Sequence, residues 1–237
     1  MNFKEVRLQF RELSGRFEFC DDDGTDHGAN FYITSGQKHL DRLSDIHKSR
    51  AIYYKGLAIG SWYVQLSNCR SIKEVWCAST TARWRLEKAN FKDLINSYFY
   101  QRIALSDAGT PTYYCPITTR TNMPLSSPME DFSDYLDIVE SSDSYNTLIY
   151  GPANSEIVIL EVHGNFYNTE LSDDEDENFW TINYPDILIM SALRKLEVFN
   201  RNSQGVNDWD RAIASELMTL NYDLVDEQSA EADQMEG

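Results

Sequence analysis

The sequence has no long apolar run and only four cysteines, and each shortage excludes a class of protein. No segment approaches the roughly 18 consecutive apolar residues of a membrane-spanning helix, so no membrane partner is expected. The first thirteen residues alternate charged and apolar side chains and lack the apolar centre of a secretory signal. The cysteines show no CxxC spacing, which predicts reduced, unbridged thiols in a protein made in the cytoplasm.

Basic residues are missing from much of the second half. Residues 1–120 contain 17 Lys/Arg and 13 Asp/Glu, whereas residues 121–237 contain 4 and 25, and the whole chain has a net charge of −17. A strongly acidic half repels phosphates and argues against nucleic-acid binding there. Two interpretations stay open: a surface that meets a basic partner or keeps DNA from adhering, or solubility alone.

Enzyme signatures are missing as well. The chain contains no GxxxxGK[ST], GxGxxG, GxSxG or HExxH motif. The segment "CDDDGTDHG" (20–28) resembles a calcium loop, but aligning Gly24 with loop position six puts Phe19 and Asn30 at the two essential ligand positions. In the run "DDEDE" (173–177), consecutive carboxylates point in different directions, which makes a cation site there a minor possibility.

No histidine has a nucleophile beside it in the sequence, and His163 is expected in a hairpin turn next to Gly164. We therefore expect a protein that is not an enzyme and has no metal or cofactor. The alternative, from the class of enzymes, is a small enzyme whose site is built from loops 20–28 and 106–155.

The N-terminal segment contains apolar residues at helical spacing. Phe3, Val6, Phe10, Leu13 and Phe17 follow each other at intervals of three and four, which predicts one buried helix face. On the other side of this helix we expect the cations Lys4, Arg7 and Arg11. A second helix is expected over residues 29–44.

The middle of the chain changes from strand to helix patterns. Short aromatic and β-branched runs over 50–82 predict a hairpin or small meander. Residues 83–105 return to helical spacing and place Arg85, Lys88 and Lys92 in a basic stripe. This stripe is the one candidate nucleic-acid surface, although a solvated stripe or one paired with acidic neighbours explains it more simply. The segment 155–164 predicts a buried strand that pairs with "NFYNTEL" across a turn.

Helical patterns return near the C-terminus. Pro185 is suited to the first turn of a helix, and the following residues up to Phe199 are apolar almost all round, which predicts a central, buried helix. The last helix has an apolar seam at Trp209, Ile213, Leu217, Leu220 and Leu224.

The fold class predicted from these patterns is α+β: a mainly helical body of about five helices with the N- and C-terminal helices packed together, and a small antiparallel β portion. A single domain is expected over residues 1–226. Its helical body comprises 1–49, 83–105 and 184–226, its β and loop portion comprises 50–82 and 106–183, and an acidic flexible tail follows over 227–237.

The segment "DENFWTINYPDILIMSALRKLEVF" (176–199) resembles the phage head-to-tail (portal) adaptor family of short-tailed phages. In that family an acidic stretch precedes an Asn-aromatic pair, then Tyr-Pro-Asp, then an apolar helix. Ala192 matches the small residue in the apolar helix, and Trp209 matches the start of the last apolar seam. The other matching positions are Asn178, Trp180, Asn183, Tyr184, Pro185 and Asp186. "AIYYKGL" and "GTPTYYC" also match, so that the resemblance extends from about residue 29 to 224.

The resemblance implies a structural virion protein, assembled in the bacterial host cytoplasm. Family members form a homo-oligomeric ring, commonly of twelve subunits, below the portal protein. The ring extends the DNA channel, through which DNA passes without specific binding, and it offers a platform for tail nozzle or fibre proteins. Another neck or tail-completion protein is the alternative within this class. The candidate portal or subunit contacts are Leu224, Val225, Asp226, Arg85, Lys88 and Lys92.

Overall fold

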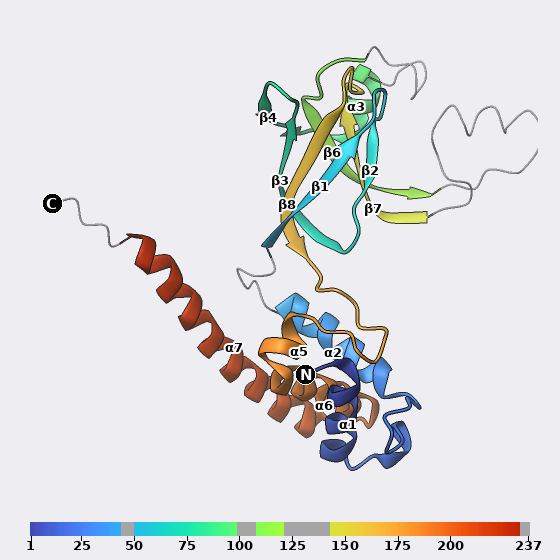
Figure 1. Ribbon diagram of the computed structural model, residues 1–237, viewed down its shortest axis with the longest axis vertical. Helices are drawn as coiled ribbons and strands as arrows, with labels where there is room; N and C mark the ends of the chain where they lie inside the picture. The colour runs from blue at the N-terminus through green and yellow to red at the C-terminus, as the bar shows by residue number, and fades with distance from the viewer. Residues whose placement is uncertain (44–49, 99–107, 121–142, 233–237) are drawn as a thin grey trace, which may run out of the picture. The chain divides into compact units, whose positions relative to one another are not determined.

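The computed structural model describes residues 1–43, 50–98, 108–120 and 143–232 of the chain (Figure 1). Contacts between Cα atoms divide the chain into two compact units. The helical unit comprises Met1–Ser49 and Tyr167–Gly237, and the sheet unit comprises Arg50–Phe166. Within the described ranges, no helix combines the length and the apolar character needed to cross a membrane.

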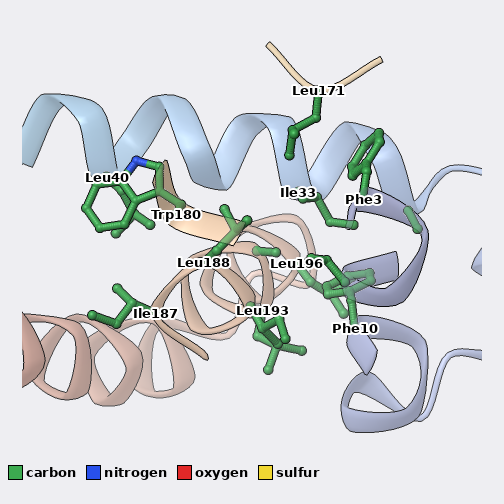
Figure 2. Packing of buried hydrophobic residues seen from close by; sticks show 14 of the residues in the cluster. Phe3, Phe10, Ile33, Leu40, Leu171, Trp180, Ile187, Leu188, Leu193 and Leu196 are labelled. Atoms are coloured by element: carbon green, nitrogen blue, oxygen red, sulfur yellow. The ribbon is translucent and has the colours of Figure 1, made fainter. Parts of the chain in front are cut away.

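The helical unit is built around one apolar helix. Its elements are α1 (Phe3–Ser14), the 3-10 helix η1 (Phe17–Phe19), α2 (Ala29–Leu43), α5 (Phe179–Asn183), α6 (Pro185–Phe199) and α7 (Ser203–Ala232). Helices α1, α2, α5 and α7 all contact α6. The core side chains include Phe3, Phe10, Ile33, Leu188 and Leu196, and Figure 2 shows them gathered between α1, α2 and α6. The predicted central role of this helix is confirmed.

Helices α2 and α6 approach closely because a glycine lies at their contact. A Cβ atom added at Gly36 would lie 2.8 Å from the Ala192 backbone nitrogen and 3.0 Å from the Ser191 carbonyl carbon. The Ser191 hydroxyl donates a hydrogen bond to the Gly36 carbonyl oxygen across the same contact (2.9 Å). The small residues at 36 and 192 therefore set the distance between the two helices.

The predicted seam of the last helix is confirmed as far as Leu220. Ile213 and Leu220 are buried, and Trp209 and Leu217 pack against the same core. Helix α7 then continues to Ala232, so residues 227–232 of the predicted tail are helical. Residues 233–237 of the predicted tail lie outside the described residues.

The face predicted for α1 is partly wrong. Phe3, Val6 and Phe10 are buried, but Leu13 and Phe17 are 63% and 58% exposed. Gly15 ends the helix in a left-handed conformation with φ of 64°, so that Phe17 lies outside the helical repeat. Arg7 and Arg11, predicted on the outer side, are buried.

The sheet unit contains two four-stranded sheets (Figure 1). The first has the order β1-β8-β3-β4, and the second has the order β2-β7-β6-β5. All pairs are antiparallel except β5 with β6. The strand bounds are Arg50–Leu57 (β1), Tyr63–Gln65 (β2), Cys69–Ala78 (β3), Arg83–Arg85 (β4), Glu87–Lys88 (β5), Tyr113–Arg120 (β6), Asp143–Gly151 (β7) and Val158–Phe166 (β8).

The two sheets share a core on their facing sides. Val75, Leu160 and Val162 of the first sheet belong to one apolar cluster with Leu148 and Tyr150 of the second. Helix α3 (Phe91–Tyr98) covers the opposite side of the second sheet, where Leu94 packs with Ile149 and Cys115. The second sheet is therefore covered on both faces.

The prediction of a mainly helical body is wrong. The class α+β holds, but the described residues contain six α-helices beside eight strands, and the strands form a compact unit of their own. Residues 83–88 form short strands rather than a helix, and residues 83–98 belong to the sheet unit. The prediction of one domain over 1–226 stays a prediction, because two compact units can belong to one domain.

The predicted strand pairing is also wrong. Strand β1 pairs with β8 and β2 pairs with β7, so neither forms a local hairpin or meander with its neighbour in the sequence. Strand β8 runs straight through His163 and Gly164, which pair with Ile52 and Ala51 of β1. His163 therefore lies inside a strand and not in a turn.

Candidate functional site

The residues that carry the family resemblance form the entrance to α6. The Asn178 side-chain oxygen accepts hydrogen bonds from the backbone nitrogens of Trp180 (3.0 Å) and Thr181 (3.1 Å). The Thr181 hydroxyl accepts one from the Asn178 backbone nitrogen (2.8 Å), which completes a capping box. Pro185 occupies the first turn of α6 and needs no N–H there. Asp186 follows, near the positive end of the helix dipole.

Trp180 connects this entrance to α2. Its ring is 1% exposed, and its Nε1 donates a 2.7 Å hydrogen bond to the Asp41 carboxylate. Asp41 is also 1% exposed and accepts two more hydrogen bonds, from the backbone nitrogen (3.1 Å) and the side-chain Nδ2 (2.6 Å) of Asn168. A buried carboxylate with three donors is a structural junction, because among the described residues it is the only acceptor of each donor.

The acidic run is an ordered loop whose backbone caps α1. The Phe3 nitrogen donates to the Asp176 carbonyl oxygen (2.9 Å), and the Lys4 nitrogen donates to the Asp174 carbonyl oxygen (3.0 Å). Helix N-termini have such N–H groups without an acceptor in the helix. The Asp176 carboxylate accepts from the backbone nitrogens of Ser172 and Asp173, both at 2.8 Å. These hydrogen bonds lower the pKa of Asp176.

One charge of this loop is paired with a buried cation. The Arg7 guanidinium, 3% exposed, donates to the Asp174 carboxylate (3.0 Å), to the Asn30 side chain (2.8 Å) and to the Gly24 carbonyl oxygen. This arrangement gives the loop a role in folding. No group of three or more His, Cys, Asp or Glu side chains that could hold a metal occurs among the described residues.

The predicted contact residues lie in different elements of the structure. Arg85 lies in β4 and pairs with Glu74 (3.3 Å), whereas Lys88 lies in β5 and Lys92 in α3. The helical stripe expected from their spacing therefore does not exist. Leu224, Val225 and Asp226 belong to α7, but their side chains lie outside what the structure describes.

A different surface was missed by reasoning from the sequence. The first sheet buries one face, and the alternate residues form an opposite face that no described element of the sheet unit covers. We call this the outer sheet face. Register places Ile52 beside His163, Tyr54 beside Glu161, and Trp76 beside both Glu161 and Arg85. Its members are Arg50, Ile52, Tyr54, Lys73, Glu74, Trp76, Arg83, Arg85, Ile159, Glu161 and His163.

Ion pairs organise the centre of this face. Arg83 donates from Nη2 (2.8 Å) and Nε (3.2 Å) to the Glu161 carboxylate, and its guanidinium lies 4.3 Å from the centre of the Trp76 ring. The hydrogen bond from Arg83 lowers the pKa of Glu161. A hollow of about 430 Å³ lies beside this centre, lined by Arg50, Ile52, Lys73 and His163 among others.

The sequence of β1, "RAIYYKGL", does indicate this face, because aromatic and aliphatic residues occur at both its odd-numbered and its even-numbered positions. Such a strand has apolar groups on its covered side and its open side.

Comparison with known proteins identifies no family for this chain: no protein-family model matches it, and no curated protein matches it.

Proposed function

We propose that this chain is a structural head-to-tail adaptor that assembles with copies of itself into a ring below a phage portal protein. The observation that carries the proposal is the segment Asn178–Phe199. Its marker residues Asn178, Trp180 and Pro185 all serve to build the entrance of one central helix. A motif with this role belongs to a scaffold rather than to a reactive centre.

The distribution of charge along the chain also supports a scaffold. The helical unit contains 26 Asp/Glu and 11 Lys/Arg, whereas the sheet unit contains 12 and 10. A strongly acidic unit and a nearly balanced one can provide the unlike surfaces that a ring of identical subunits needs, since each subunit contacts its neighbours through two different faces. The ring is proposed to hold about twelve subunits and to dock tail nozzle or fibre proteins.

The test is imaging and mass measurement of the purified chain, alone and after mixing with its cognate portal protein. A ring with a central channel, or ring formation on the portal, is the expected result. A chain that stays monomeric and binds neither portal nor tail proteins would contradict the proposal. A lumen lined by basic or neutral side chains would contradict only the idea that acidic residues let DNA slide through.

A further inference from the structure

The outer sheet face combines exposed apolar groups with positive charge that the described residues leave uncompensated. Ile52, Tyr54 and Ile159 are 45%, 60% and 48% exposed. Surface apolar residues that occur singly need no explanation, but a contiguous set on one sheet face indicates a contact surface. Register holds these three together: Tyr54 faces Glu161 and Gly56 faces Ile159 on adjacent strands.

The carboxylates on this face are already engaged. Glu161 is bound by Arg83, and Glu74 is bound by Arg85 (3.3 Å) and by the Trp76 Nε1 donor (3.1 Å). Arg50 and Lys73, at the rim of the hollow, have no carboxylate within ion-pair distance among the described residues. The surface therefore combines exposed apolar side chains with two cations that have no carboxylate partner among the described residues, and it suits an apolar group flanked by acids.

The helical unit presents a segment of the matching chemistry. In the acidic loop, Asp174 pairs with Arg7 and Asp176 caps the loop, while Asp173 and Glu177 are exposed and make no side-chain ion pair with described residues. Ile182 of α5, a few residues further on, is 57% exposed. The loop is held in place by its bonds to α1, so little conformational entropy would be lost when it docks.

We infer that the outer sheet face of one copy binds the segment Asp173–Ile182 of a second copy. Arg50 and Lys73 would meet Asp173 and Glu177, and Ile182 would lie against the apolar side chains of β1 and β8. This contact joins two different surfaces and so propagates from copy to copy, closing into a ring or continuing as a filament. It rests on the proposed function in that it supplies the contact between subunits of that ring.

The experiment measures self-association of the full chain by sedimentation velocity over a range of concentrations and salt. The double variant Arg50→Glu/Lys73→Glu should weaken association at least about tenfold, whereas the control Arg211→Glu, an exposed cation on α7 outside the face, should not. Tyr54→Ser should also weaken association, with Ile59→Ser, an exposed isoleucine between β1 and β2, as its control. Circular dichroism verifies that every variant is folded.

A charge exchange tests the identity of the occupant. Asp173→Lys/Glu177→Lys should weaken association when alone, and mixing it with Arg50→Glu/Lys73→Glu should restore mixed assemblies. Restoration supports the inference. If the two variants stay apart, or if each assembles like the unmodified chain, the contact lies elsewhere and the inference is wrong while the ring proposal stands. A monomeric chain overturns this inference as well, and the portal-binding test then decides the proposed function separately.

Discussion

The buried Asp41 carboxylate should contribute much of the stability of the helical unit, and Asp41→Ala tests this. The substitution leaves three donors without their acceptor: the Trp180 Nε1, and the backbone nitrogen and Nδ2 of Asn168. Each stranded donor costs about 1–3 kcal/mol. Because the three donors share one junction, their costs do not add fully, and we expect the free energy of unfolding of the helical unit to fall by about 3–5 kcal/mol.

Native-state hydrogen exchange is the assay, because it reports on each unit separately. Amides of α2 and α6 should lose about 3–5 kcal/mol of protection in Asp41→Ala, while the strands β3 and β8 serve as an internal reference. Asp41→Asn keeps one acceptor oxygen and should cost less, about 1–2 kcal/mol. The control Asp208→Ala, at an exposed position of α7, should change protection by less than about 0.5 kcal/mol. A loss below about 1 kcal/mol in Asp41→Ala would refute the junction role.

Three further predictions concern packing and ionisation. Gly36→Ala places a methyl group against the α6 backbone and should lower the urea midpoint of the helical unit, because it costs about 1–3 kcal/mol of unfolding free energy. An unchanged midpoint would contradict the role of Gly36 in setting the distance between α2 and α6. Because Arg83 holds the pKa of Glu161 below its ordinary value, the stability from this carboxylate is present above the ordinary value of about 4.3 and is lost as the pH falls through the lowered folded-state pKa. Glu161→Gln should therefore reduce the acid-induced loss of exchange protection in β8, and an equal loss in both proteins would contradict the pairing. Burial raises the pKa of Cys69 to about 11 and of Cys77 to about 12, so mass spectrometry after treatment with iodoacetamide at about pH 8 should find both unmodified until the chain is unfolded.

The helices that follow an uninterrupted repeat were predictable, and so were the strand segments within 50–82 and 155–164, but the pairing of the strands was not. Helix α2 buries Ile33 and Leu40, and α7 buries Ile213 and Leu220 at the same spacing, because a helix face is set by neighbours three and four positions apart. Strand β1 pairs with β8, more than a hundred residues later in the chain. No local pattern specifies a partner at that separation. The short strands at 83–88 have too few residues to show a period. Because the residues that follow have helical spacing, the predicted helix was begun too early, at residue 83.

Buried arginines explain the error in α1. Arg7 and Arg11 were assigned to the solvent side because charged residues are rarely buried. In the structure both are buried beside the 20–28 loop, where Arg7 binds Gly24 and Arg11 donates to the Asp22 carboxylate (2.5 Å). These carboxylates and carbonyl oxygens come from loops, which carry no periodic signal, so the sequence could not assign partners to the two cations.

The concentration of charge beside apolar sequence at 173–190 is explained by the different tasks of neighbouring side chains. Asp174 balances a buried guanidinium, and Asp176 fixes the loop that caps α1. Directly after them, Asn178 and Trp180 fasten the loop to the core, and Pro185 starts α6. The side chains of Asp173, Glu177 and Ile182 make none of these contacts, so the local fold does not account for their exposure. The loop is held in place and exposes two carboxylates and an apolar side chain that take no part in holding it. These groups suit a partner surface whose cations have no carboxylate partner among the described residues, and we infer that this partner is the outer sheet face of a second copy.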